Sequence, residues 1–186
     1  MPYVVLACRC LIGMVFTVSV ISKLRSGPAY RAFTSWLGTL PLLRAADARP
    51  FAAALAATEV AVVAMLALPW TWRAGLLVAA VVLAVFAVGA LVVARAGVRA
   101  PCQCFGASEV PLGRRHVLRN AALSAAAAVG AVAGGQAASR PAGIAISLGV
   151  AAAATLFVVY LDDLAAVLAA PRTAGDSAAQ TVRQGG

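Results

Sequence analysis

The fold class can be predicted from the segment Ala74–Ala94, which reads AGLLVAAVVLAVFAVGALVVA. The stretch carries no charge and consists mainly of Val, Leu and Ala. A helix needs about 20 consecutive apolar residues to cross the hydrocarbon core of a bilayer. This segment therefore predicts a transmembrane helix.

The composition of the whole chain agrees with that prediction. The 186 residues are 63% hydrophobic and 11% charged, whereas a soluble domain carries roughly a quarter charged residues. We therefore expect an integral membrane protein with no room for a soluble catalytic domain. The net charge of +9 comes from basic residues in short loops between apolar runs, where they set orientation and meet anionic lipid. Nucleic-acid binding is not expected.

Apolar runs on both sides of this stretch predict further spans. The run Asn120–Ala138 consists mostly of Ala, Ser and Gly, so we expect other helices to surround it. No strand pattern or internal repeat interrupts the series, which predicts an all-α, polytopic bundle. The additional spans are Val4–Ile21, Phe51–Leu68, Asn120–Ala138 and Ile144–Leu161.

The remaining segments are too polar to cross the membrane. Ser26–Pro50 contains Trp36 among several Arg residues, so part of it is expected to lie on the surface as a short amphipathic helix. The tail from Pro171 onward is rich in Gly, Ser, Ala, Gln and Thr, a composition typical of disorder.

The distribution of basic residues predicts the orientation. With five spans, one face holds all 15 Lys and Arg residues except Arg9, Arg73 and Arg140. Cytoplasmic loops carry an excess of Lys and Arg. The N-terminus is therefore predicted outside a plasma membrane, and the loop after the third span is predicted to be cytoplasmic.

That loop carries the residues with the clearest chemistry, Pro101-Cys102-Gln103-Cys104-Phe105-Gly106. Cys102 and Cys104 could form a reversible disulfide across one residue, and a strained disulfide of this kind exchanges readily. Neighbouring Arg residues favour the reactive thiolate. Two other interpretations stay open: inert thiols in a turn, and half of a metal site with His116 as a third ligand, although no fourth ligand is evident.

Further candidate residues are the pair Cys8 and Cys10, His116 of the same loop, and Glu59. Cys8 and Cys10 repeat the spacing, but residues two apart on a helix point to nearly opposite sides, so small core residues are expected, with a relay partner as the alternative. His116 is expected to be a solvated loop residue.

Glu59 lies within the second span, where a charge is usually paired or functional. The simplest prediction is an ion pair with Arg9 of the first span, and Lys23 is a second possible partner. A proton carrier, or a polar contact for a quinone head group, is the alternative.

Together these residues resemble the MauE family, the methylamine utilisation membrane proteins related to DoxX. The resemblance rests on Cys102-Gln103-Cys104-Phe105-Gly106, on Arg119-Asn120 opening the fourth span, on Lys23 and on Glu59. It covers about residues 1 to 136 and implies a four-helix membrane core associated with disulfide or redox maturation of secreted proteins. The expected organisation is a MauE-like domain over residues 1–138, a fifth, C-terminal span within 139–170, and a disordered tail over 171–186.

The resulting hypothesis is a multi-pass membrane protein that passes electrons or disulfides through Cys102 and Cys104. Expected partners are membrane lipid and a thioredoxin-like or cysteine-rich secreted protein, with a quinone near Glu59 as a possible cofactor. If the loop is cytoplasmic, the pair would receive electrons from a cytoplasmic reductant. The alternative, from another class, is a non-catalytic assembly subunit that holds a partner protein.

Overall fold

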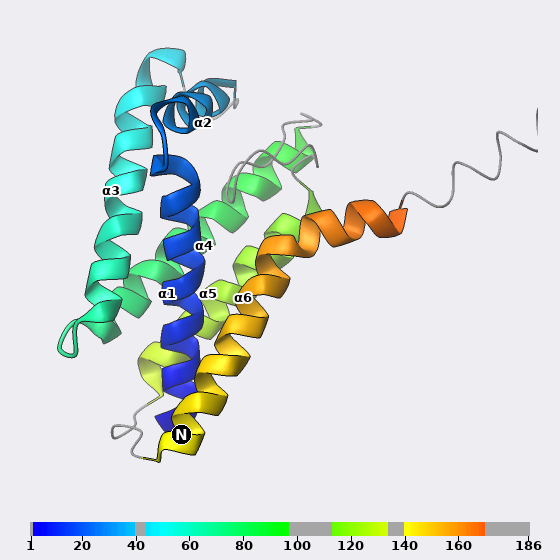
Figure 1. Ribbon diagram of the computed structural model, residues 1–186. Helices are drawn as coiled ribbons and strands as arrows, with labels where there is room; N and C mark the ends of the chain where they lie inside the picture. The colour runs from blue at the N-terminus through cyan, green and yellow to red at the C-terminus, as the bar shows by residue number, and fades with distance from the viewer. Residues whose placement is uncertain (1, 40–43, 97–112, 134–139, 170–186) are drawn as a thin grey trace, which may run out of the picture.

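The computed structural model describes residues 2–39, 44–96, 113–133 and 140–169, and every regular element in these ranges is helical (Figure 1). The all-α fold class is thereby confirmed. The elements in chain order are α1 (Pro2–Leu24), α2 (Gly27–Thr39), a 3₁₀ turn η1 (Ala45–Asp47), α3 (Ala48–Ala67), α4 (Trp72–Arg95), α5 (Arg114–Val132) and α6 (Pro141–Ala169).

Within the part of the chain that the structure describes, four helices are long and apolar enough to cross a membrane: α1, α3, α4 and the part of α6 over Pro141–Tyr160. The fourth predicted span corresponds to α5, which has three Arg residues and many Ala residues and does not meet the composition of a span by itself. It begins at Arg114 rather than Asn120 and ends at Val132. As expected, α5 is packed against other helices, namely α4 and α1.

Helix α1 occupies the centre of the bundle and contacts each of the five other α-helices. The end of α1, the end of α4 and the start of α5 lie toward the same end of the bundle, the upper end in Figure 1. Large side chains fill the core between α1, α3, α4 and α5. Its fully buried members include Ile12, Val62 and Leu76.

Small residues let the helices approach closely, as is typical of membrane bundles. A Cβ atom on Gly130 of α5 would lie 2.9 Å from the Cβ of Cys8 on α1. Ser124 of α5 donates a hydrogen bond to the carbonyl oxygen of Ala80 on α4, at 2.8 Å. Helix α6 also packs on α1, where the Ser147 hydroxyl lies 3.3 Å from the carbonyl oxygen of Tyr3.

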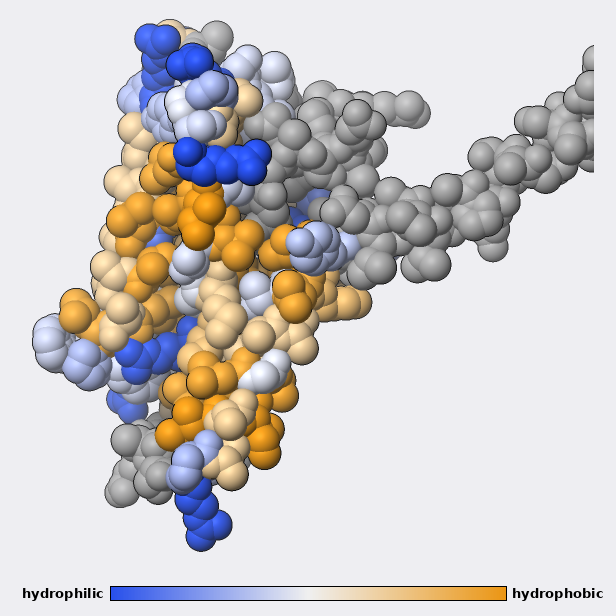
Figure 2. Space-filling view, in the orientation of Figure 1, coloured by the Kyte–Doolittle hydropathy of each residue, from blue (hydrophilic) through white to orange (hydrophobic). Residues whose placement is uncertain are grey.

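Helix α2 corresponds to the predicted surface helix, and it packs across the end of α1 and the start of α3. Its buried residues Phe33 and Leu37 form a second cluster with Ala52 of α3 and Val93 of α4. Figure 2 shows the result on one face: hydrophobic side chains cover much of the middle, and hydrophilic ones gather at the upper end, at the lower end and at the left, level with the turn between α3 and α4. This distribution fits a helical bundle whose middle part is surrounded by lipid.

Candidate functional site

A buried ion pair joins α1 to α3 beneath helix α2. Lys23 Nζ lies 2.6 Å from Glu59 Oε1, and the two side chains are only 4% and 1% exposed. Charges inside a membrane protein are costly and are usually paired or functional. The Lys23–Glu59 pair therefore marks a candidate functional site.

The prediction that Arg9 pairs with Glu59 is wrong, and the direction of helical side chains explains why. Arg9 instead donates from Nε to the carbonyl oxygen of Leu66 at 2.6 Å, and from Nη2 to those of Ala67 and Leu68. Each Cα–Cβ bond of a helix tilts toward the helix N-terminus. Because α1 and α3 are antiparallel, Arg9 reaches away from Glu59 and Lys23 reaches toward it.

Further contacts hold the pair in position. The Ser19 hydroxyl lies 2.7 Å from Lys23 Nζ and 3.3 Å from Glu59 Oε1. Sequence reasoning missed Ser19, although residues four apart share one helix face and its spacing from Lys23 is a visible signal. The ring of Phe33 on α2 covers the ammonium, with Nζ 5.1 Å from the ring centroid. Helix α2 thus closes the site from above.

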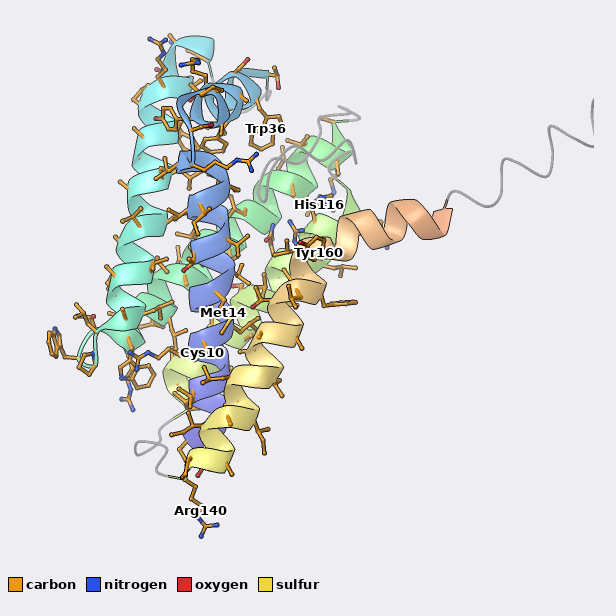
Figure 3. The ribbon with its side chains drawn as sticks, viewed as in Figure 1. Cys10, Met14, Trp36, His116, Arg140 and Tyr160 are labelled. Atoms are coloured by element: carbon orange, nitrogen blue, oxygen red, sulfur yellow. The ribbon has the colours of Figure 1, made fainter. Side chains whose placement is uncertain are left out.

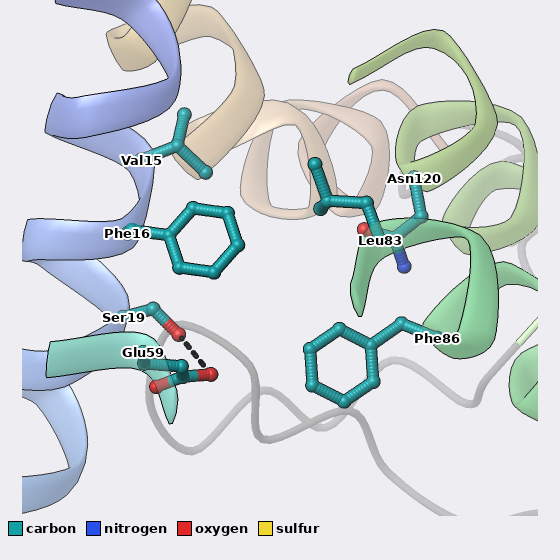
Figure 4. Close-up of a pocket in the computed structure, with 7 residues that line it drawn as sticks. All are labelled: Val15, Phe16, Ser19, Glu59, Leu83, Phe86 and Asn120. Atoms are coloured by element: carbon teal, nitrogen blue, oxygen red, sulfur yellow. Dashed lines mark hydrogen bonds between the residues drawn. The ribbon is translucent and has the colours of Figure 1, made fainter. Parts of the chain in front are cut away.

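A small cavity opens on the other side of Glu59 (Figure 4). It has a volume of about 20 Å³, and a water molecule needs roughly 10–15 Å³ by this measure. Glu59 Oε2 is buried and has no hydrogen-bond partner among the described residues. The cavity beside the carboxylate can therefore hold about one water molecule. Its lining comprises Val15, Phe16, Ser19, Glu59, Leu83, Phe86 and Asn120.

The first two turns of α5 bring more polar side chains to this end of the bundle. His116, Arg119 and Asn120 are all buried, and His116 is only 1% exposed. The expectation of a solvated loop histidine is therefore wrong, because α5 begins at Arg114 and includes it. His116 Nδ1 accepts a hydrogen bond from the backbone N–H of Gly113, at 3.3 Å. Asn120 lines the cavity beside Glu59.

Of the two Cys-x-Cys pairs, the structure describes Cys8 and Cys10. Cys102 and Cys104 lie outside the described residues, so their redox and metal interpretations stay predictions. Cys8 and Cys10 are free thiols. Cys8 faces Gly130 of α5, and Cys10 lines a groove between α1, α3 and α6. They therefore contact different neighbours on the two sides of α1, as packing residues do.

A known protein family matches most of this chain. The family model described as methylamine utilisation protein MauE matches residues 1–133. Neither a curated protein nor a solved structure matches this chain. The matched region holds the Lys23–Glu59 pair, the polar start of α5 and the Cys102–Cys104 segment, and it ends one residue after α5. This multi-pass membrane protein belongs to the MauE family of methylamine utilisation proteins.

Proposed function

We propose that this chain exchanges thiols and disulfides through Cys102 and Cys104 during the maturation of secreted or membrane proteins. The observation that carries the proposal is that the family match includes this Cys-x-Cys pair. The segment that holds the pair connects α4 to α5, and these two helices pack extensively on each other. A firmly packed helix pair would give a reactive segment fixed attachment points.

Arginine residues lie at the end of α4 and at the start of α5, which the Cys-x-Cys segment joins, and their positive charge suits thiolate chemistry. Arg95 ends α4, Arg114 begins α5, and Arg119 is buried one turn further along. Positive charge near a thiol stabilises the thiolate, which is the nucleophile in disulfide exchange. The proposal assigns this stabilising role to these Arg residues.

The proposed exchange moves two electrons from the dithiol of one protein to the disulfide of another. One thiolate of the pair attacks the disulfide of a partner protein and forms a mixed disulfide. The second thiolate of the pair then attacks that bond, releases the partner as a dithiol and closes Cys102 to Cys104. A thioredoxin-like dithiol protein reopens the pair, so two electrons pass from it to the partner. With the pair on the cytoplasmic side, as the charge bias predicts, the electrons would come from the cytoplasm.

We further propose that Glu59 is a proton site rather than a quinone contact. The cavity beside it has room for about one water molecule, which is much smaller than a quinone ring. A buried carboxylate oxygen with no partner among the described residues is placed to accept a hydrogen bond from such a water, and we propose that a proton passes through this contact. Replacing both Lys23 and Glu59 by Met would leave a folded but inactive protein if this is correct, and an active one if the pair is only structural.

The chain supplies a matched control for the cysteine test, because Cys8-Arg9-Cys10 has the same spacing as Cys102-Gln103-Cys104. Cells expressing the full chain are treated with acid, alkylated with a large maleimide and analysed by gel shift. We expect a reversible disulfide that Cys102→Ser and Cys104→Ser abolish and that the double change of Cys8 and Cys10 to Ser preserves.

Side-specific labelling of the pair with a membrane-impermeant maleimide tests the predicted orientation in the same cells. A Cys102–Cys104 pair that stays reduced under every growth condition, together with full function of the Cys102→Ser variant, would overturn the proposal.

A further inference from the structure

A groove runs along the outer side of α1 between α3 and α6. Its volume is about 580 Å³, within the range of roughly 300–1,000 Å³ typical of ligand pockets. Cys10 and Met14 lie on this side of α1, toward α6, in Figure 3. The apolar lining includes Met14, Val18, Val63, Leu66, Ala152 and Leu156.

Among the described residues, every side-chain oxygen and nitrogen atom along the groove is hydrogen-bonded, with one exception. The hydroxyls of Thr17 and Thr155 donate to carbonyl oxygens of their own helices. Arg9 lines one end of the groove, and its three hydrogen bonds use Nε and Nη2. Nη1 has no hydrogen bond to any described residue. The exception is therefore a cationic donor.

No carboxylate of the described residues neutralises Arg9, because the salt bridge of that part of the chain joins Lys23 to Glu59. The carbonyl groups at the C-terminal end of α3 carry only a partial negative charge. The full positive charge of Arg9, next to a lipid-facing groove, therefore favours the binding of an anion that is not part of the chain.

The depth of Arg9 indicates which anion fits. Its three carbonyl partners lie at the last turn of α3 and at Leu68, directly before the turn that carries Trp70, which is 76% exposed. Trp is common at membrane interfaces. From Arg9 the groove continues along α1 to Val18, about 14 Å further into the hydrocarbon at 1.5 Å per residue. It thus offers a cation near the interface and an apolar channel below it.

We infer that this groove binds one anionic phospholipid, with its phosphate on Arg9 and an acyl chain between α1, α3 and α6. The site is separate from the proposed thiol chemistry, since it uses the opposite end of α1 from Lys23 and neither Cys102 nor Cys104. Failure of one proposal therefore leaves the other unaffected.

Native mass spectrometry of the purified full chain tests the site, using an equimolar mixture of phosphatidylglycerol and phosphatidylcholine. We expect phosphatidylglycerol to bind about fivefold more strongly, the factor for one cation attracting an anionic lipid. Arg9→Gln should reduce this preference to about equal binding. Gly13→Leu should abolish binding of both lipids by filling the groove, because a Cβ at Gly13 meets only Leu66 Cδ1, at 4.0 Å.

Gly149→Leu is the matched control, because a Cβ at Gly149 of α6 has nothing within 4 Å, and it should leave lipid binding unchanged. Equal binding of the two lipids by the unmodified chain would overturn the proposal. So would phosphatidylglycerol binding that survives Gly13→Leu, or a co-purified isoprenoid quinone in place of the phospholipid. If Arg9→Gln fails to fold, the Gly13→Leu and Gly149→Leu comparison still decides the question.

Discussion

Replacing one member of the Lys23–Glu59 pair should cost far more stability than replacing both. In Lys23→Met, the Glu59 carboxylate would stay buried at 1% exposure, and its one remaining partner among the described residues would be the Ser19 hydroxyl, 3.3 Å from Oε1. Breaking a buried ion pair in this way costs about 3–5 kcal/mol, whereas replacing the whole pair by apolar residues of similar volume is often neutral. Glu59→Met should cost a similar amount, because it leaves the buried Lys23 ammonium without its counter-ion.

The measurement is a double-mutant cycle on Lys23→Met, Glu59→Met and the combined variant. Reversible unfolding of the purified chain in mixed detergent micelles, followed by circular dichroism, gives each change in unfolding free energy. The single variants should lower the melting temperature by about 6–20 °C at 2–4 °C per kcal/mol. The combined variant should be more stable than either single one, with a coupling energy of at least about 3 kcal/mol.

Arg31→Met is the control for loss of a positive charge, because Arg31 is exposed on α2, and its effect should stay within about 0.5 kcal/mol. Additive losses in the cycle, or single losses below about 1 kcal/mol, would show that the pair is not the buried, mutually dependent unit described above.

Three further predictions concern packing and helix ends. Gly130→Ala should destabilise the chain by about 1–3 kcal/mol, because the new Cβ would lie 2.9 Å from Cys8 Cβ, while Gly149→Ala should not; thermal unfolding of both variants makes the comparison. Arg9→Gln should speed amide hydrogen exchange near the end of α3, since it removes hydrogen bonds to three carbonyl groups there, and unchanged exchange relative to an Arg73→Gln control would contradict this. Phe33→Ala should cost about 3–5 kcal/mol in the same unfolding assay, because Phe33 is 3% exposed and covers Lys23, and a loss no larger than that of Arg31→Met would count against this role for α2.

The sequence alone determined the class of the molecule and its helices. Hydrophobic run length is enough for this, since a backbone inside lipid must satisfy its own hydrogen bonds and a helix does so locally. The uncharged run Ala74–Ala94 and the polar segment around Trp36 predicted α4 and the surface helix α2. The Cys-x-Cys pair, Lys23 and Glu59 likewise indicated the family by residue type and position along the chain.

The packing of the helices, by contrast, sets which charges meet and which polar residues are buried. Arg9 and Lys23 were both possible partners of Glu59, and the choice depended on the antiparallel packing of α1 and α3 combined with the tilt of helical side chains toward the N-terminus. His116 looked solvated because nothing in the local sequence shows that the start of α5 is buried in the folded chain. The water-sized cavity at Glu59 and the groove at Arg9 are likewise formed by residues from three or more helices, and hydrophobic periodicity carries no information about which helices become neighbours.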